Sequence, residues 1–441
     1  MARIAPFRGL LYNPNKVRDL AKVIAPPYDV ISPEERARLY RKSPYNIVHL
    51  DLNDEADGYQ TVARLFPEWQ ESKILVRDET PAVYFLSQRF PRNGETEIER
   101  LGFIALTRLE DFSTGTIRPH EHTLAGPKED RFRLMLACRA NLSPIFALYS
   151  QPTRLINRML WERVQDVPPI LEVREEHGSL CRLWRIADPE LIGLVQQEME
   201  SRTLLIADGH HRYEAALNYR DHLRRERQAW TGQEAFNYVM AYFANMKDEG
   251  LVILPTHRLL RAFRPIPFQE LEEALQRYFY LEPYPKTPDG RRWFLRALKS
   301  GGKRRRLIGA SFRRDPRYLI LRLKNKRIMQ RLARDVSTPL RELDVTVLHL
   351  LILEHILGLS AEEQLKEGEL SYSQNEQSVL QAVEKEEHQA AFILNPPDPE
   401  VILTIALGGE RMPQKSTYFF PKLITGLVIN KIDPNEEIAE L

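Results

Sequence analysis

The feature that most constrains the fold is an apolar run that ends in Asp-Gly and passes at once into a helical pattern, within Thr203 to Leu217. The run has strand character up to Ala207, and the residues after Gly209 place Tyr213, Ala216 and Leu217 at core spacing for a helix. A strand that turns through glycine into a helix brings the helix N-terminus, with its unpaired backbone N–H groups, to the strand end. Strand and helix signals alternate in this way up to about Pro267, which predicts an α/β to α+β fold.

The length and the change of pattern along the chain predict its division into domains. A chain of 441 residues corresponds to about two or three domains. We expect an N-terminal α+β segment at residues 1–110, a central domain at 111–268 and a C-terminal α+β domain at 269–441.

Several local patterns predict individual elements. Ser32 followed by Pro33 predicts a helix start, with Ser32 as N-cap. Strand patterns at Val83–Leu86 and Leu101–Leu106 flank a polar turn at Asn93-Gly94. Further along the chain, we expect short strands with a turn at Ser300-Gly301-Gly302 between Phe279 and Leu323, and a long buried helix from about Val345 to Gly358.

The charge balance argues against a protein that coats DNA or membranes. There are 63 Lys and Arg residues against 61 Asp and Glu residues, which gives a net charge of +2, whereas such proteins need a concentrated basic face. The run Lys303 to Arg306 is better interpreted as a solvated hairpin end than as a nucleic-acid contact, because no aromatic residues are interleaved with it.

No segment has the pattern of a signal peptide or of a membrane span. The most apolar stretch, Val345 to Leu359, is interrupted by polar residues, and a span needs about 20 mostly apolar ones. Cys138 and Cys181 have neither metal-site spacing nor the number that a disulfide framework requires. These features predict a cytoplasmic protein.

The strongest chemical signal is Asp208-Gly209-His210-His211-Arg212, at the strand–helix turn. The helix N-terminus, two imidazoles and a guanidinium offer hydrogen-bond donors to phosphate oxygens at one point. Asp208 would compete for these donors unless it has another task, such as holding a metal ion or accepting a proton. The alternative interpretation is a capped helix start with surface histidines.

The second signal is Arg118-Pro119-His120-Glu121-His122-Thr123, on a proline-containing loop that leads into a helix. A glutamate between two histidines fits a general base or a metal-binding carboxylate. Four of the chain's 11 histidines lie in these two short motifs. The alternative here is a polar surface loop.

Other chemistries have weaker support. His120, His122, His210, His211 and Asp208 would be enough ligands for zinc, but the chain lacks a His-Glu-x-x-His helix. It also lacks a Gly-x-Ser-x-Gly elbow, a Walker loop and a Gly-x-Gly-x-x-Gly fingerprint.

The two motifs together resemble the ParB-like free-serine kinases of the ParB/sulfiredoxin superfamily, between about Thr116 and Leu217. The resemblance implies a ParB/sulfiredoxin-like central domain in which Glu121 and Asp208 are the catalytic carboxylates. It also implies phosphate or nucleotide binding by a set of neighbouring residues: His120, His122, Gly209, His210, His211 and Arg212.

The whole chain resembles the ParB/RepB-like conserved bacterial and archaeal proteins known as domain-of-unknown-function family 1015. The phrases that carry this likeness lie at residues 25–31, 118–123, 207–212, 254–258 and 412–422. They add pocket candidates in proline-bounded loops, namely Tyr28, Asp29, His257, Arg258, Lys415, Ser416 and Thr417. The alternative for each is ordinary loop structure.

These signals predict a nucleotide-dependent phosphotransferase that acts on a small hydroxyl metabolite, with free L-serine the leading candidate. The expected cofactor is Mg²⁺ with ATP or ADP, the metal being held through Asp208 or Glu121. Two other classes stay open: a metal-dependent phosphatase, for example on O-phosphoserine, and a non-catalytic, nucleotide-gated protein that binds DNA or a protein partner. A nucleic-acid or membrane partner is disfavoured by the charge balance.

Overall fold

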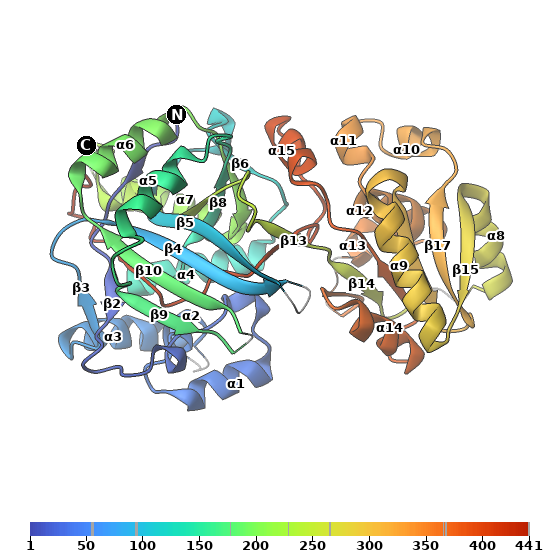
Figure 1. The fold of residues 1–441 in the computed structure, drawn as a ribbon, viewed down its shortest axis with the longest axis horizontal. Coiled ribbons are helices and arrows are strands. Elements are labelled where there is room, and N and C mark those ends of the chain that lie inside the picture. Colours follow the sequence, from blue (N-terminus) through green and yellow to red (C-terminus); the bar gives the residue numbers. More distant parts are fainter. Residues whose placement is uncertain are drawn as a thin grey trace. The chain divides into compact units, whose positions relative to one another are not determined.

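The computed structural model describes residues 1–53, 57–92, 96–176, 178–227, 229–263, 266–364, 366 and 368–439. Its contacts group the chain into two compact units (Figure 1). Unit 1 comprises Met1–Pro119, Thr123–Val252 and Pro421–Leu441, and unit 2 comprises His120–His122 and Ile253–Phe420. The chain therefore passes between the units after Pro119, His122, Val252 and Phe420. The expected boundaries at residues 110 and 268 stay predictions.

Unit 1 is built on a large mixed sheet with the strand order β6-β11-β8-β12-β5-β4-β10-β9, and β1 pairs with β5. The pairs β11–β6 and β12–β8 are parallel and the other neighbours are antiparallel. The strands are β1 (Ile4–Ala5), β4 (Val83–Arg92), β5 (Thr96–Arg108), β6 (Ile117–Pro119), β8 (Ile145–Tyr149), β9 (Leu171–Arg174), β10 (Leu180–Ile186), β11 (Leu204–Asp208) and β12 (Tyr238–Asn245). Strands β8 and β12 are buried along their whole length, as expected of central strands covered on both faces.

The helices of unit 1 include α4 and α7, which pack against each other. Their bounds are α1 (Pro33–Lys42), α2 (Val48–Asp51), α3 (Gly58–Glu71), α4 (Ala125–Cys138), α5 (Leu155–Val164), α6 (Pro189–Glu200) and α7 (His210–Glu226). Single 3₁₀ turns are η1 (Leu20–Lys22), η2 (Tyr28–Val30), η3 (Phe112–Thr114) and η4 (Ala235–Asn237). Short pairs join β2 (Leu10–Tyr12) to β3 (Leu75–Arg77), and β7 (Ala140–Asn141) to β21 (Asn430–Lys431).

Unit 2 contains an antiparallel sheet with the order β15-β17-β16-β19-β14-β18. Its strands are β14 (His257–Leu260), β15 (Phe279–Pro285), β16 (Leu307–Phe312), β17 (Arg317–Leu323), β18 (Leu370–Ser373) and β19 (Ala390–Ile393). The helices are α8 (Phe268–Tyr278), α9 (Pro288–Arg305), α10 (Arg327–Leu332), α11 (Thr338–Arg341), α12 (Asp344–Thr346), the π-helix η5 (Val347–Ile356), α13 (Ala361–Gln364), α14 (Glu376–Glu384) and α15 (Pro399–Leu407). Two more strands are β13 (Val252–Leu254) and β20 (Tyr418–Phe420).

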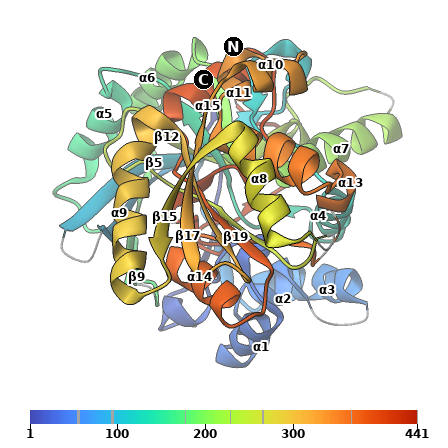
Figure 2. The ribbon, with the colours of Figure 1, turned by 90° about the vertical axis from the view of Figure 1, so that its right-hand side faces the viewer.

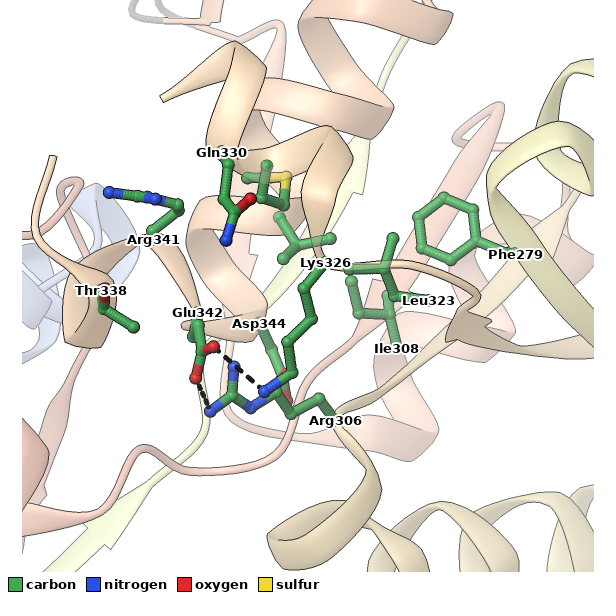
Figure 3. Close-up of a pocket in the computed structure, with 12 residues that line it drawn as sticks. Phe279, Arg306, Ile308, Leu323, Lys326, Gln330, Thr338, Arg341, Glu342 and Asp344 are labelled. Atoms are coloured by element: carbon green, nitrogen blue, oxygen red, sulfur yellow. Dashed lines mark hydrogen bonds and ion pairs between the residues drawn. The ribbon is translucent and has the colours of Figure 1, made fainter. Parts of the chain in front are cut away.

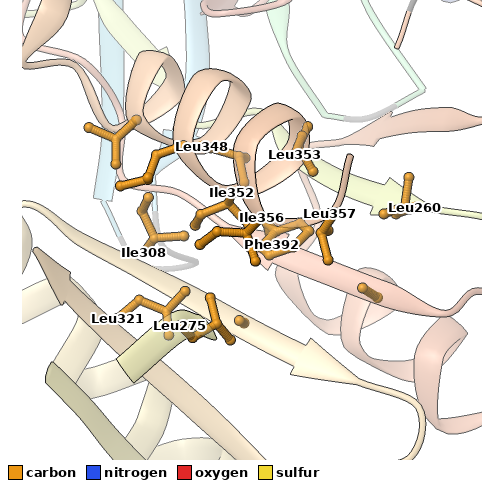
Figure 4. Packing of buried hydrophobic residues seen from close by; sticks show 14 of the residues in the cluster. Leu260, Leu275, Ile308, Leu321, Leu348, Ile352, Leu353, Ile356, Leu357 and Phe392 are labelled. Atoms are coloured by element: carbon orange, nitrogen blue, oxygen red, sulfur yellow. The ribbon is translucent and has the colours of Figure 1, made fainter. Parts of the chain in front are cut away.

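The period of two along the strands gives unit 2 a core on each face of its sheet. In β17, Leu319 and Leu321 point to one face, where they meet α8 and η5, and Tyr318 and Ile320 point to the other, where they meet α9 and α14. Figure 4 shows Leu348, Ile352 and Ile356 of η5 above Ile308, Leu321 and Phe392 of the sheet, and Figure 2 shows α9 along the strands. Position 309 has room only for glycine, because a Cβ there would lie 2.6 Å from the ring of Phe294.

Several sequence predictions are confirmed. Ser32 caps α1 by accepting a hydrogen bond from the backbone N–H of Glu35. The two predicted strands are parts of the paired β4 and β5, whereas the turn at Asn93-Gly94 lies outside the described residues. The buried helical segment after Val345 is present, wound for most of its length as the π-helix η5. Within the described ranges, no helix is long and apolar enough to cross a membrane.

The prediction of a turn at Ser300-Gly301-Gly302 is wrong, because these residues belong to α9. The helix continues through both glycines since Phe294 and Leu298, four residues apart, anchor it on the sheet. The basic run therefore ends a helix and not a hairpin. The side chains of Lys303, Arg304 and Arg305 lie outside the described part of the structure.

Candidate functional site

The strand–glycine–helix geometry predicted for the Asp-Gly-His-His-Arg motif is present in unit 1. Strand β11 ends at Asp208, and α7 begins at His210. Between them, Gly209 has a φ of +88°, a left-handed conformation that strains any residue with a side chain. A Cβ at Gly209 would also lie 3.0 Å from the guanidinium of Arg212. Glycine thus allows both the turn and the close approach of Arg212.

Asp208, Arg212 and Lys422 form a largely buried group of charges, called here the Asp208 cluster. Arg212 Nη2 donates to Asp208 Oδ2 at 2.9 Å, and Lys422 Nζ donates to Asp208 Oδ1. The side chains of Asp208, Arg212 and Lys422 are only 16%, 12% and 13% exposed. The carboxylate is therefore held between two cations at the start of a helix.

The charges of this cluster keep Asp208 ionised. Burial raises the pKa of Asp208, but the positive charges of Lys422 and Arg212 and the hydrogen bond from Lys422 outweigh burial and hold that pKa well below its usual range. An efficient general base has a pKa near the working pH. Asp208 is therefore better suited to orienting the two cations than to accepting a proton.

Arg212 is fixed by further contacts. Its Nη1 donates to Ser143 Oγ at 2.8 Å and to the carbonyl oxygen of Pro144 at 2.5 Å, just before β8 begins. In the described structure, its buried Nε has no hydrogen-bond partner. The guanidinium is thus held in one plane, and its Nε–H is the donor left for an anion.

Lys422 is the residue of this cluster that the site predictions missed. Lys422 contacts Asp208 although the two residues are 214 positions apart in the sequence. The preceding carbonyl, of Pro421, accepts a hydrogen bond at 2.6 Å from Arg100, which is fully buried beside the rings of Phe146 and Tyr242. The available signal was the motif at residues 412–422, of which Lys422 is the last member.

The two histidines of the motif differ in their surroundings. His210 is 8% exposed and lies close enough to Asp208 to contribute to its low pKa. His211 accepts a hydrogen bond at Nε2 from the backbone N–H of Leu124, at 3.0 Å. An imidazole that accepts at Nε2 carries its proton on Nδ1. His211 therefore ties the start of α7 to the segment before α4.

Tyr28 lies beside a second buried ion pair of unit 1. The guanidinium of Arg131 lies over the ring of Tyr28, 4.0 Å from its centre, and donates from Nη1 to Asp51 Oδ1 at 2.9 Å. Burial raises the pKa of Asp51, and the charges of Arg131 and Arg212 oppose that rise. Asp29 lies near enough to act on the same carboxyl. Tyr28 and Asp51 thus both lie within range of the charge of Arg212 in the Asp208 cluster.

Glu121 lies in unit 2, in a group called here the Glu121 cluster: His120, Glu121, Ser416 and Thr417. Glu121 Oε1 accepts hydrogen bonds from the backbone N–H groups of Ser416 at 3.0 Å and Thr417 at 3.1 Å, and from Thr417 Oγ1 at 3.1 Å. Consecutive backbone N–H groups of this kind form an anion-binding concavity. Ser416 and Thr417, which the sequence indicates as pocket candidates, hold the carboxylate of Glu121 in this structure.

The histidines beside Glu121 also differ from each other. His120 is fully buried, 3.5 Å from Glu121 Oε1 and 2.8 Å from Thr417 Oγ1 through its Nε2. Its ring lies edge-on to Phe419. His122 is exposed. His120 is therefore built into the Glu121 cluster, whereas His122 stands at its surface.

His257 and Arg258 support the loop of the Glu121 cluster from β14. Arg258 is fully buried and donates to the carbonyl oxygens of Thr256, of Gln414 at 3.4 Å and of Lys415 at 3.2 Å. Burial lowers its pKa to about 10, which leaves it charged at neutral pH. Burial lowers the pKa of His257 to about 4, so His257 is neutral and accepts from the N–H of Leu394. Lys415 itself is exposed.

The partners of Asp208 determine whether it can hold the expected Mg²⁺ ion. Both carboxylate oxygens of Asp208 are paired with cations, and this donor set does not suit Mg²⁺. Among the described residues, no group of three or more His, Cys, Asp or Glu side chains is placed to hold a metal ion. Asp208 therefore does not fit the expected role of a magnesium ligand in this arrangement.

Replacing Thr417 by valine should loosen the Glu121 cluster while leaving the fold intact. The change removes the hydroxyl that contacts both Glu121 and His120, and a hydrogen bond to a charged group contributes about 2 kcal/mol. Amide hydrogen exchange at Ser416 and Thr417 should accelerate at least about tenfold. The control is Thr404→Val, on the exposed face of α15. Unchanged exchange in Thr417→Val would show that the hydroxyl does not hold the loop.

The fold and the Asp208 cluster together define a mixed α/β protein in which two cations hold a largely buried carboxylate at a strand–helix junction. The chain belongs to the family described as "Protein of unknown function (DUF1015)", whose model matches residues 4–346. A comparison with curated proteins finds no match.

Among solved structures, three similar proteins have identities of 14% or less. A mutant free serine kinase in complex with AMP has 12% identity and a TM-score of 0.37, over 75% of this chain and 92% of that one. A conserved hypothetical protein from Pyrococcus furiosus has 14% identity and a TM-score of 0.34, over 73% and 92%. SbnI with a C-terminal truncation, from Staphylococcus aureus, has 10% identity and a TM-score of 0.35, over 73% and 85%. Similarity at this level carries no argument about activity.

Proposed function

We propose that this protein is a nucleotide-dependent phosphotransferase that acts on a small hydroxyl metabolite, with free L-serine the leading acceptor. The observation that carries the proposal is the Asp208 cluster: two fixed cations at the N-terminal end of α7. Phosphoryl transfer depends mainly on positioning and on neutralising the charge of the transferred group. Arg212 and Lys422 supply that charge, and the motif resemblance to free-serine kinases supports the choice of acceptor.

In the proposed reaction, the acceptor hydroxyl oxygen forms a bond to the terminal phosphorus of the nucleotide, and the bond from phosphorus to the departing nucleotide breaks. The hydroxyl proton is released to solvent water. Arg212, Lys422 and the imidazole of His210 bind the phosphoryl oxygens, and Asp208 orients the two cations. The chain's own cations carry the charge neutralisation, and magnesium enters the assay only as the complex with ATP or ADP.

The test is formation of O-phosphoserine by the purified full chain, followed by mass spectrometry, with L-serine and either ATP or ADP as donor. L-alanine is the negative control because it lacks the hydroxyl group. Product that depends on both nucleotide and serine supports the proposal. Release of phosphate from O-phosphoserine without nucleotide points instead to a phosphatase, and nucleotide binding without turnover points to a binding protein. Either result overturns the proposal.

Arg212→Ala should reduce turnover about a hundredfold, because one lost charge-stabilising donor costs roughly 3 kcal/mol in the transition state. Arg225→Ala is the matched control, since Arg225 is exposed in the last turn of the same helix. Trp161 and Trp184 pack against each other in unit 1, and their fluorescence reports whether each variant is folded. Wild-type turnover in a folded Arg212→Ala protein would rule out this assignment.

A further inference from the structure

A pocket of about 80 Å³ lies within unit 2, among β15, β16, α10, α11 and the start of η5. It is lined by neither the Asp208 cluster nor the Glu121 cluster. Figure 3 shows its two sides, with Phe279, Ile308 and Leu323 on one and the ion-paired Glu342 on the other. The proposed phosphotransfer makes no use of this pocket.

The apolar side of the pocket is part of the core of unit 2. Phe279, Ile308, Met329 and Val347 line it and are each at most 5% exposed. These residues come from two strands and two helices, so their positions are fixed by the packing of the whole unit. An engineered cavity of about 150 Å³ takes a benzene ring. A pocket about half that size therefore has room for a short branched chain of three or four carbons.

The polar side carries an excess of positive charge. Glu342 pairs with both Arg306 and Lys326, the latter at 3.0 Å, so one carboxylate serves two cations. Arg341 donates from Nη2 to the carbonyl oxygen of Val336, and its buried Nε has no hydrogen-bond partner among the described atoms. A guanidinium with an unused donor is suited to a carboxylate or another anion.

The remaining carboxyl group of the pocket does not cancel this charge. Asp344 is half-buried, and its desolvation raises its pKa to about 7, although the charge of Arg306 lowers it. At neutral pH, much of Asp344 is protonated and can donate a hydrogen bond. Its surroundings therefore accept an anion more readily than a cation.

We propose that this pocket binds a small carboxylate with a short branched apolar tail. The tail lies against Phe279, Ile308 and Val347, and the carboxylate accepts hydrogen bonds from Arg341 and the neighbouring cations. The apolar side of the pocket selects the branched tail of the ligand, and the positive charge of the polar side selects its carboxylate. This site is independent of the phosphotransfer proposal, because all its residues lie in unit 2 and none belongs to either cluster.

The probe is 3-methylbutanoate, titrated into the full chain labelled with ¹³C in its methionine methyl groups. Met329 lines the pocket, and the spectrum of Met329→Leu identifies its signal. We expect the Met329 signal to shift with a dissociation constant of about 1 mM or tighter, as is usual for a ligand of this size. The amine of the same shape, 3-methylbutylamine, and inorganic phosphate should leave the signal unchanged.

Two variants and a control make the test decisive. Arg341→Gln should weaken binding of 3-methylbutanoate at least about tenfold by removing the charged donor, and Val347→Phe should abolish it by filling the apolar side. Arg327→Gln, an exposed arginine of α10 outside the pocket, should bind as the wild type does. Equal binding of the amine or of phosphate, undiminished binding in Arg341→Gln, or no shift of Met329 would each overturn the proposal.

Discussion

Arg131→Met should lower the free energy of unfolding by about 4 kcal/mol. The side chains of Arg131 and Asp51 are both only 6% exposed, and they are joined at 2.9 Å. Methionine keeps the length of the side chain but leaves Asp51 as a buried charge without its partner, which typically costs 3–5 kcal/mol. Urea unfolding followed by tryptophan fluorescence measures the loss in unit 1. Arg133→Met, on the exposed face of the same helix, should cost less than about 0.5 kcal/mol.

The pH dependence of this variant distinguishes loss of charge pairing from loss of packing. The pKa of Asp51 is already raised by burial, and without Arg131 it should rise further. A carboxyl whose folded pKa is above its unfolded pKa loses stability as pH rises through that interval. The deficit of Arg131→Met should therefore be smaller at about pH 5 than at about pH 8. A deficit that does not change with pH would mean that packing, and not the unpaired carboxylate, accounts for the loss.

Lys422→Met should lower the free energy of unfolding by about 3 kcal/mol and should weaken nucleotide binding as well. It removes one of the two cations that hold Asp208, whose carboxylate is 16% exposed. The control is Lys16→Met, at an exposed lysine of unit 1, with an expected change below about 0.5 kcal/mol. Urea unfolding at neutral pH and calorimetric titration with ATP and ADP provide the two readouts.

The sign of the pH effect at Asp208 is opposite to that at Asp51. The folded pKa of Asp208 is well below its unfolded value of about 3.9. Its contribution to stability is therefore fully present above that unfolded value and is lost as pH falls toward the folded pKa. Wild type should lose stability in this acidic range, and Lys422→Met should lose less. Identical acid profiles would contradict the assignment of Lys422 as the partner of Asp208.

The sequence predicts the part of the Asp208 cluster that depends on neighbours in the chain. A strand, an Asp-Gly turn and a helix determine where Asp208 and Arg212 lie, because the two residues are four positions apart across one turn. The positive φ of Gly209 follows from the same local pattern. Similar local rules predict the cap at Ser32 and the strands β4 and β5.

The long-range parts are the ones that local patterns could not supply. Nothing near Lys422 in the sequence indicates a partner 214 residues away. The loop at Ser416 and Thr417 has the composition of an anion site, and only the folded unit 2 shows that Glu121 occupies it. The glycines at 301 and 302 indicate a turn, yet the packing of Phe294 and Leu298 on the sheet carries α9 through them.

The return of residues 421–441 to unit 1 ties the Asp208 cluster to the order in which the chain is synthesised. Asp208 and Arg212 are synthesised more than two hundred residues before Lys422. The interval between the synthesis of β7 and that of its partner β21 is longer still. During that interval, the carboxylate has only one of its two cations. A polypeptide released before residue 422 lacks the lysine of the Asp208 cluster, so only chains translated past that point carry both cations of the proposed phosphate site.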